Sequence, residues 1–145
     1  MHPVERIVRE LGGIASTAEL IRRGCDTDMI RLVASYGKIL RIRQGWYATP
    51  DVPADSLRAW RAGGRLTCVS AAIFHGVWSD DDGALHVRVD ANAAHIRRDS
   101  DIVFHWKRRA ATGTRLAVSL PEALETIAGC QPSDVFLAIQ RAANR

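Results

Sequence analysis

The stretch Gly37-Lys38-Ile39-Leu40-Arg41-Ile42-Arg43-Gln44-Gly45-Trp46-Tyr47 decides the fold of the N-terminal part of the chain. Its residues 39–43 read as a short strand in which basic side chains alternate with apolar ones. Gln44-Gly45 is typical of a turn, and residues 46–49 are predicted to form the returning strand. We therefore expect a small β-hairpin with Arg41, Arg43 and Gln44 at or near its tip.

Three short helices are predicted upstream of this hairpin, at about residues 3–11, 17–23 and 28–36. Pairs of glycines or single glycines end them, and Ser16, Thr17, Asp26 and Thr27 are candidate N-caps. In the third helix, Ile30 and Val33 lie one turn apart and should face the core. The second and third helices then form a helix-turn-helix, and the hairpin that follows makes it a winged helix. The outward side of the third helix carries Thr27, Asp28, Arg31 and Ser35, near the end that reaches base edges in known complexes.

The charge distribution favours a phosphate-rich partner. The chain has 145 residues and a net charge of +4, with 20 Lys+Arg against 16 Asp+Glu. No acidic residue lies between Met29 and Pro50, whereas Arg31, Lys38, Arg41 and Arg43 do. A basic window on one surface is the electrostatic footprint of a nucleic-acid-binding protein. Almost all the basic residues are arginines, which make forked contacts to phosphate and guanine.

The N-terminal motifs resemble those of the AbiEi family, the antitoxins of type IV toxin–antitoxin systems and related regulators. The resemblance is carried by residues 12–20, by Gly24 and by residues 37–47, with Ile39 where leucine is usual and Gln44 where a basic residue is common. It continues in residues 70–76, Ser-Ala-Ala-Ile-Phe-His-Gly, which begin the second domain of that family. The resemblance implies a DNA-binding winged helix and autoregulation of a toxin–antitoxin operon. A Vsr-like endonuclease domain follows in many relatives, and this chain has no acid–lysine cluster of that type.

The rest of the chain predicts a second, α+β domain. We place a winged helix at residues 1–50, a linker with a short helix at 51–63 and the second domain at 64–145. Leu85, Val87 and Val89 alternate with polar residues, which predicts a half-buried strand. Further strands are expected at 102–106 and 116–118, with helices around residues 70–75, 120–127 and from 133 onward.

No constellation in the sequence points to an enzyme or to a metal. Cys25, Cys68 and Cys130 lie far apart and lack the C-x-x-C spacing of a zinc site, so we expect reduced and mostly buried thiols. His86 and His105 could flank each other as ligands on neighbouring strands, although packing is the ordinary role for such residues. Asp80-Asp81-Asp82 is interpreted as a solvated turn, and His75 as a packed helix-end residue. The four tryptophans, Trp46, Trp60, Trp78 and Trp106, are expected to pack rather than to stack on bases.

The leading hypothesis is a sequence-specific repressor that binds double-stranded DNA. The third helix would enter the major groove, the wing would contact backbone or minor groove, and the end of the second helix would clamp phosphate. The predicted contacts are Thr27, Asp28, Arg31, Ser35, Lys38, Arg41, Arg43, Gln44, Arg22 and Arg23. A second set could add DNA contacts from the C-terminal domain or could be scattered surface charge: Arg97, Arg98, Lys107, Arg108 and Arg109.

Two biological roles and one alternative function stay open at this point. The repressor could autoregulate an antitoxin operon or act in phage or prophage immunity. The alternative is a protein-interaction module that neutralises a toxin or another protein, or that regulates a nuclease domain. We expect no cofactor, no metal, no membrane span, a cytoplasmic location and a monomer or weak dimer.

Overall fold

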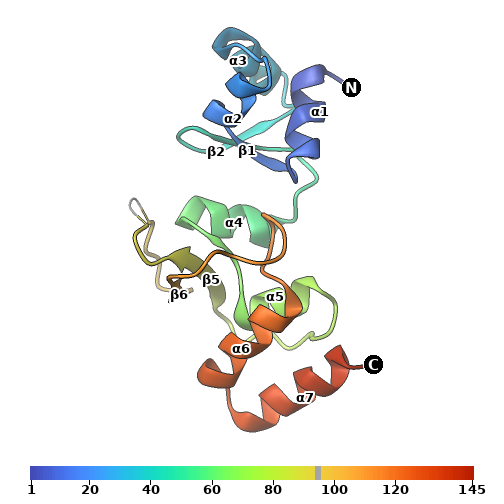
Figure 1. Cartoon of the computed structure of the whole chain (residues 1–145), viewed down its shortest axis with the longest axis vertical. Helices are drawn as coiled ribbons and strands as arrows, with labels where there is room; N and C mark the ends of the chain where they lie inside the picture. Colours follow the sequence, from blue (N-terminus) through green and yellow to red (C-terminus); the bar gives the residue numbers. More distant parts are fainter. Residues whose placement is uncertain (94–95) are drawn as a thin grey trace. The chain divides into compact units, whose positions relative to one another are not determined.

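The computed structural model describes residues 1–93 and 96–145, and it has the mixed α+β fold expected from the sequence (Figure 1). This part of the chain contains seven helices and two three-stranded sheets. It divides into two compact units, Met1–Arg61 and Ala62–Arg145. None of the described helices combines the length and apolar character that crossing a membrane requires.

The first unit contains the predicted helices and hairpin. Its elements, in chain order, are α1 (Pro3–Glu10), β1 (Ile14–Ser16), α2 (Thr17–Arg22), α3 (Thr27–Ser35), β2 (Leu40–Arg43), β3 (Trp46–Ala48) and α4 (Ala54–Ala62), the last of which reaches the boundary. Ser16 caps α2 through a capping box with Glu19, and Asp26 caps α3 by accepting from the Met29 amide at 2.8 Å. Each cap satisfies an amide that the helix itself leaves unpaired.

A small apolar core joins the helices of this unit. Ile30 and Val33 of α3 are buried as predicted, whereas Ile21, which the apolar residues at 18, 20 and 21 placed on the core-facing side of α2, is 50% exposed. The reason is that α2 has only six residues, so one turn and a half presents Leu20 alone to the core. The core consists of Val4, Val8, Ala15, Leu20, Cys25, Ile30, Val33 and Ile39.

The hairpin is confirmed, and it belongs to a larger sheet than the sequence indicated. The strand order is β1-β3-β2, all antiparallel. Residues 14–16 form an edge strand whose Ile14 pairs with Ala48 and whose Ser16 pairs with Trp46, where the sequence indicated only a connector at residues 14–15 and a candidate N-cap at Ser16. Three residues are too few to show the alternation by which a strand is recognised.

The segment after the hairpin is packed against the first unit. The helix expected from Ser56 begins at Ala54, and Val52 before it is 7% exposed and lies beneath Gly13. Trp60 of α4 packs on Trp46 of β3, with ring centroids 4.6 Å apart. These contacts place most of the expected linker within the first compact unit.

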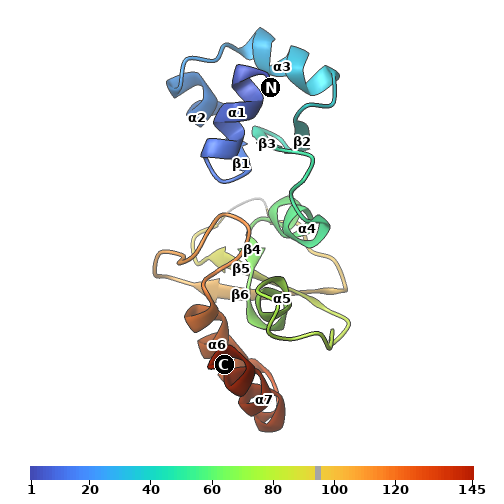
Figure 2. The same cartoon turned by 90° about the vertical axis from the view of Figure 1, so that its right-hand side faces the viewer.

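The second unit contains three helices and a mixed sheet, with α6 and α7 at one end of the unit (Figure 2). Its elements are β4 (Arg65–Leu66), α5 (Cys68–Phe74), β5 (Leu85–Asp90), β6 (Ile102–Lys107), α6 (Leu120–Cys130) and α7 (Ser133–Ala143). The sheet order is β4-β5-β6, antiparallel and then parallel. The strand predicted at 116–118 is reduced to one bridge, between Ala117 and Leu66. Helix α5 packs against β5 and α6, and α7 packs on α6.

Strand β5 is buried on both faces, and the prediction of a half-buried strand is therefore wrong. Its apolar residues are buried as expected, but His86 and Arg88 are also only 2% and 3% exposed. β5 is the central strand, paired on both edges, and its polar side is covered as well. A buried guanidinium requires a partner, and Glu122 of α6 supplies it at 3.1 Å. The Glu122 carboxylate also accepts from the Thr112 hydroxyl at 2.8 Å.

Breaking this buried pair should destabilise the second unit strongly. We expect Glu122→Ala to cost about 3–5 kcal/mol, because it removes the buried carboxylate that faces Arg88 and leaves only the largely exposed Asp90, 2.8 Å away, to balance the buried charge. Urea unfolding followed by circular dichroism measures this loss. The control is Glu125→Ala, which removes an exposed partner of Arg109 one turn away and should cost less than about 1 kcal/mol. Equal losses in the two variants would contradict the role assigned to the Arg88–Glu122 pair.

Candidate functional site

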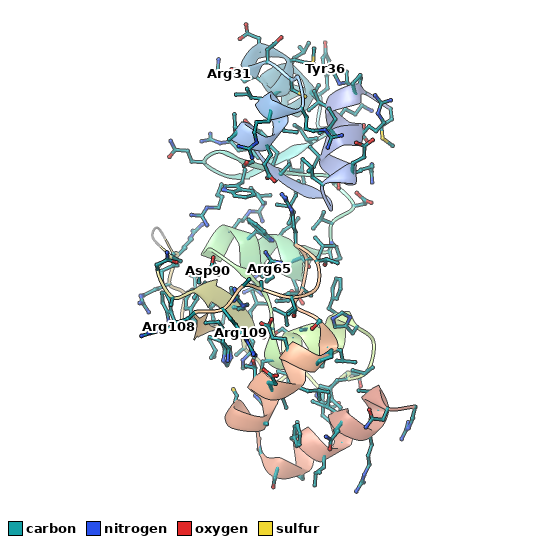
Figure 3. All side chains as sticks on the ribbon, in the orientation of Figure 1. Arg31, Tyr36, Arg65, Asp90, Arg108 and Arg109 are labelled. Carbon is teal, nitrogen blue, oxygen red and sulfur yellow. The ribbon has the colours of Figure 1, made fainter. Side chains whose placement is uncertain are left out.

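A hollow of about 530 Å³ lies on the first unit between α3, the start of α2 and the β2–β3 hairpin. None of the residues that line it is acidic. Arg31 projects from the outer side of α3 (Figure 3). The lining residues are Thr17, Thr27, Ile30, Arg31, Ala34, Ser35, Arg41, Gly45 and Tyr47.

Four of the predicted contact residues meet at this hollow, namely Thr27, Arg31, Ser35 and Arg41. All four are exposed. The Arg31 side chain is 73% exposed and its guanidinium lies 3.9 Å from the carboxylate of Asp28, which is itself almost fully exposed. An exposed ion pair at this distance contributes little, so it does not hold the Arg31 charge in place. The hollow therefore combines two arginines with the hydroxyls of Thr27 and Ser35, of which the Ser35 hydroxyl donates to the Leu32 carbonyl at 2.6 Å and can accept a further hydrogen bond.

The other predicted residues of this unit lie outside the hollow. Asp28, Lys38, Gln44 and Arg22 are exposed, without lining it. Arg23 is paired with Glu10 of α1. Arg43 is half-buried, and its guanidinium donates to the Trp60 carbonyl of α4 at 3.4 Å. The hairpin therefore presents Arg41, and not Arg43, to the hollow.

The basic residues of the second unit have mixed surroundings. Arg97 and Arg108 are exposed, and Lys107 is half-buried. Arg98 lies over the ring of Phe104, 5.9 Å from its centroid. Arg109 is bound on both sides, because its side chain pairs with Glu125 and its carbonyl accepts from Arg88 (Figure 3). The pairing of Arg109 leaves Arg97 and Arg108 as the most accessible charges of this set.

A second group of side chains gathers in the second unit, and the sequence argument from spacing missed it. The sulfur and nitrogen atoms of Cys68, His86, His105 and Cys130 all lie within 4.8 Å of one another. Cys68 begins α5 and Cys130 ends α6, while the histidines lie on the adjacent parallel strands β5 and β6. These four residues are far apart in the sequence, but the fold brings them together. In the sequence, only the possible pairing of the two histidines on neighbouring strands indicated part of this cluster.

Burial controls the protonation of this group. The pKa of His105 falls to about 4, because burial and the neighbouring His86 and Lys107 disfavour the imidazolium. Burial, together with Cys130, raises the pKa of the Cys68 thiol to about 12. At neutral pH, His105 is therefore a neutral imidazole and Cys68 a thiol. The third cysteine, Cys25, is buried in the core of the first unit.

The remaining candidates have structural partners. The His75 ring lies at the end of α5, with Nε2 2.8 Å from the Val118 carbonyl oxygen. Asp81 and Asp82 accept from the amides of Gly83 and Ala84 and so form the expected turn. Trp78 donates to the Asp80 carbonyl, and the pairing of Trp46 with Trp60 agrees with the packing role. Trp106 is 43% exposed.

A comparison with known protein families and with characterised proteins finds no match to this chain.

Gly45 shapes the hairpin side of the hollow through its backbone, with φ at +79°. No atom lies within 4 Å of the position of an added Cβ, so the conformation alone determines the cost of a side chain. We expect Gly45→Ala to destabilise the first unit by about 1–2 kcal/mol and Gly45→Asn by less.

Gly129 supplies the matched control. It lies in α6, equally without neighbours around an added Cβ, and its φ is not positive. Gly129→Ala should therefore stabilise the protein by about 0.5–1 kcal/mol. Chemical denaturation measures both variants, and the same sign of change in both would refute the backbone explanation.

Proposed function

We propose that the chain is a sequence-specific, double-stranded DNA-binding transcriptional repressor whose first unit is a winged helix. Helix α3 enters the major groove, and the β2–β3 hairpin contacts the backbone or the minor groove. Supporting this proposal, the order helix-strand-helix-helix-strand-strand and the antiparallel β1-β3-β2 sheet agree with that fold. The resemblance of residues 12–20, Gly24 and residues 37–47 to AbiEi-family motifs also supports it.

The observation that carries the proposal is the acid-free hollow with Arg31 and Arg41 on its two sides. Arg31 is available for a forked contact to guanine, because it lies at the middle of α3 on its outer side and is exposed. Thr27 and Ser35 offer hydroxyls for a base edge or a phosphate. Arg41 lies on the hairpin, within reach of the backbone of the same duplex.

The biological role follows from the resemblance alone. It favours autoregulation of an antitoxin operon. A repressor of phage or prophage immunity would need the same kind of sequence-specific DNA-binding surface. Both roles need a protein that prefers its own upstream DNA, so a binding experiment tests them together.

A specific observation also favours the protein-interaction alternative. Met29 and Leu32 of α3, Tyr36 at its C-cap and Ile21 of α2 are large apolar side chains with 36–72% of their surface exposed. Exposed apolar side chains in such a group are typical of a protein-binding surface. On a DNA-binding helix, the same side chains contact thymine methyl groups. The salt dependence of binding separates the two, because only phosphate neutralisation releases counterions.

The test is fluorescence anisotropy of the full chain against its own upstream intergenic DNA and a scrambled duplex of equal length, at two salt concentrations. We expect a preference of about 100-fold or more for the native sequence. The log–log slope with salt should be about −0.9 for each phosphate contacted. Absence of binding to either duplex would overturn the proposal and favour a protein partner.

Point variants test the assignment of contacts. Arg41→Ala should weaken binding to both duplexes and flatten the salt slope by about one unit. Arg31→Ala should cost about 1–3 kcal/mol on the native duplex and relax the preference at one base pair.

The charge-matched controls are Arg6→Ala and Arg43→Ala. Arg6 lies on α1 and does not line the hollow, and Arg43 faces Trp60. We expect both variants to bind DNA much as the parent does. If either control weakened binding as much as Arg41→Ala, the hollow would not be the contact surface.

A further inference from the structure

We propose that Cys68, His86, His105 and Cys130 hold a tetrahedral zinc ion that joins α5, β5, β6 and α6 of the second unit. This inference goes beyond DNA binding and does not depend on it.

The spacing of the four ligand atoms is the first argument. In a tetrahedral site, Zn–S is about 2.3 Å and Zn–N about 2.0–2.1 Å, which separates the ligand atoms by roughly 3.3–3.8 Å. Here all four atoms lie within 4.8 Å of one another, so rotamer changes of a few tenths of an ångström to about one ångström complete the site. Two thiolates and two imidazoles in this geometry select zinc among the abundant divalent metals.

The two imidazoles face each other so that both can bind the same metal ion. Nδ1 of His86 lies 2.9 Å from Nε2 of His105, and the rings are stacked with centroids 5.2 Å apart. In the neutral metal-free pair, one of these nitrogens carries the only proton between them. When zinc binds, His105 carries its proton on Nδ1, and both facing nitrogens present lone pairs to the ion.

An outer carboxylate already orients one of the ligands. Nε2 of His86 lies 2.7 Å from Oδ2 of Asp82, which fixes the proton on Nε2 and turns Nδ1 into the cluster. The same Asp82 oxygen accepts from Gln131 at 3.1 Å, and Gln131 also contacts the sulfur of Cys130 at 3.6 Å. A carboxylate behind a ligating histidine is the usual outer shell of a zinc site.

The backbone at Cys68 supplies a further independent sign. Cys68 has φ of +54° and is the single non-glycine residue with positive φ in residues 1–93 and 96–145. This conformation costs about 1–2 kcal/mol for a residue with a Cβ. Strain of this kind persists where the surrounding structure requires a side chain in one place. Here it aims a fully buried thiol at the histidines.

The charge balance of the bound state is favourable. Binding Zn²⁺ releases the two thiol protons to solvent, and the ion with its two thiolates is then electrically neutral. Neutrality suits ligands such as Cys68 and His86, which are at most 2% exposed. Cys130 is exposed, so the ion has a path to the site. Four protein ligands leave no open position, so the role is structural and not catalytic.

Metal titration of the reduced, chelator-treated full chain tests the proposal. Zinc should bind with a stoichiometry of one per chain and a dissociation constant of roughly 10 nM or below, measured by competition with a chromophoric chelator. Cobalt(II) should give the intense visible bands of a tetrahedral ion and a thiolate charge-transfer band. Zinc should also raise the melting temperature of the chain. Absence of stoichiometric zinc binding would overturn the proposal.

Two variants, each with a control, locate the site. Cys130→Ser, at an exposed position, should weaken zinc binding more than about 100-fold, and Cys25→Ser should leave it unchanged. Asp82→Ala should weaken it about 10–100-fold, while Asp80→Ala in the same turn should not. Circular dichroism of each metal-free variant checks that the fold is retained. Zinc binding that survived in Cys130→Ser with parental affinity would place the metal elsewhere and refute the site.

The competing explanation is a disulfide between Cys68 and Cys130. Mass spectrometry of the protein before reduction distinguishes it, since a disulfide lowers the mass by two hydrogens and bound zinc survives native ionisation. A disulfide in the isolated protein, together with failure of the reduced chain to bind zinc, would overturn the proposal.

Discussion

The second unit depends on a central strand that is buried on both faces although every other residue is polar. Covering β5 removes water from His86 and Arg88, and each must then find a protein partner. Arg88 finds Glu122 of α6, and His86 finds Asp82 and His105. Helix α6 and strand β6 are thus attached to β5 by polar contacts as well as by apolar packing.

This constraint also brings the cysteines into the cluster. The apolar cluster that contains Cys68 and Ile127 holds α5 against α6, so the first residue of α5 and the last residue of α6 meet beside the histidines. A metal at this point would offset the cost of burying the Cys68 thiol and the His86 imidazole by forming bonds to them, with His105 and Cys130 as the other two ligands. The buried polar side of β5 and the proposed zinc site therefore both follow from the way α5, α6 and β6 pack around β5.

The first unit is stabilised in a different way from the second. Its helices have six to nine residues, too short to persist alone, and they are held by side-chain caps and a core of mainly aliphatic side chains. The core uses the inner sides of α1, α2 and α3, so the outer side of α3 carries polar and apolar residues that packing does not need. These outward residues of α3, together with a hairpin that has no acidic residue, are the basis of the proposed DNA contact. Arg43 is an exception on this hairpin, because its guanidinium donates to the backbone carbonyl of Trp60 and it does not line the hollow.

Local signals in the sequence were sufficient for the α+β class, the three N-terminal helices and the hairpin, and they limited each of two caps to two candidates, of which the structure uses Ser16 and Asp26. Each of these depends on residues within a few positions, and glycines and capping side chains mark their ends directly. Three features depended on the tertiary structure: the strand status of residues 14–16, the two-sided burial of β5, and the meeting of Cys68, His86, His105 and Cys130. Pairing and burial join residues that are far apart in the chain, and no short-range period records such a contact. The sequence by itself therefore determined the local elements and the accessible basic surface, while the register of β5 and β6 and the docking of α5 on α6 decided which side chains lie together in the interior.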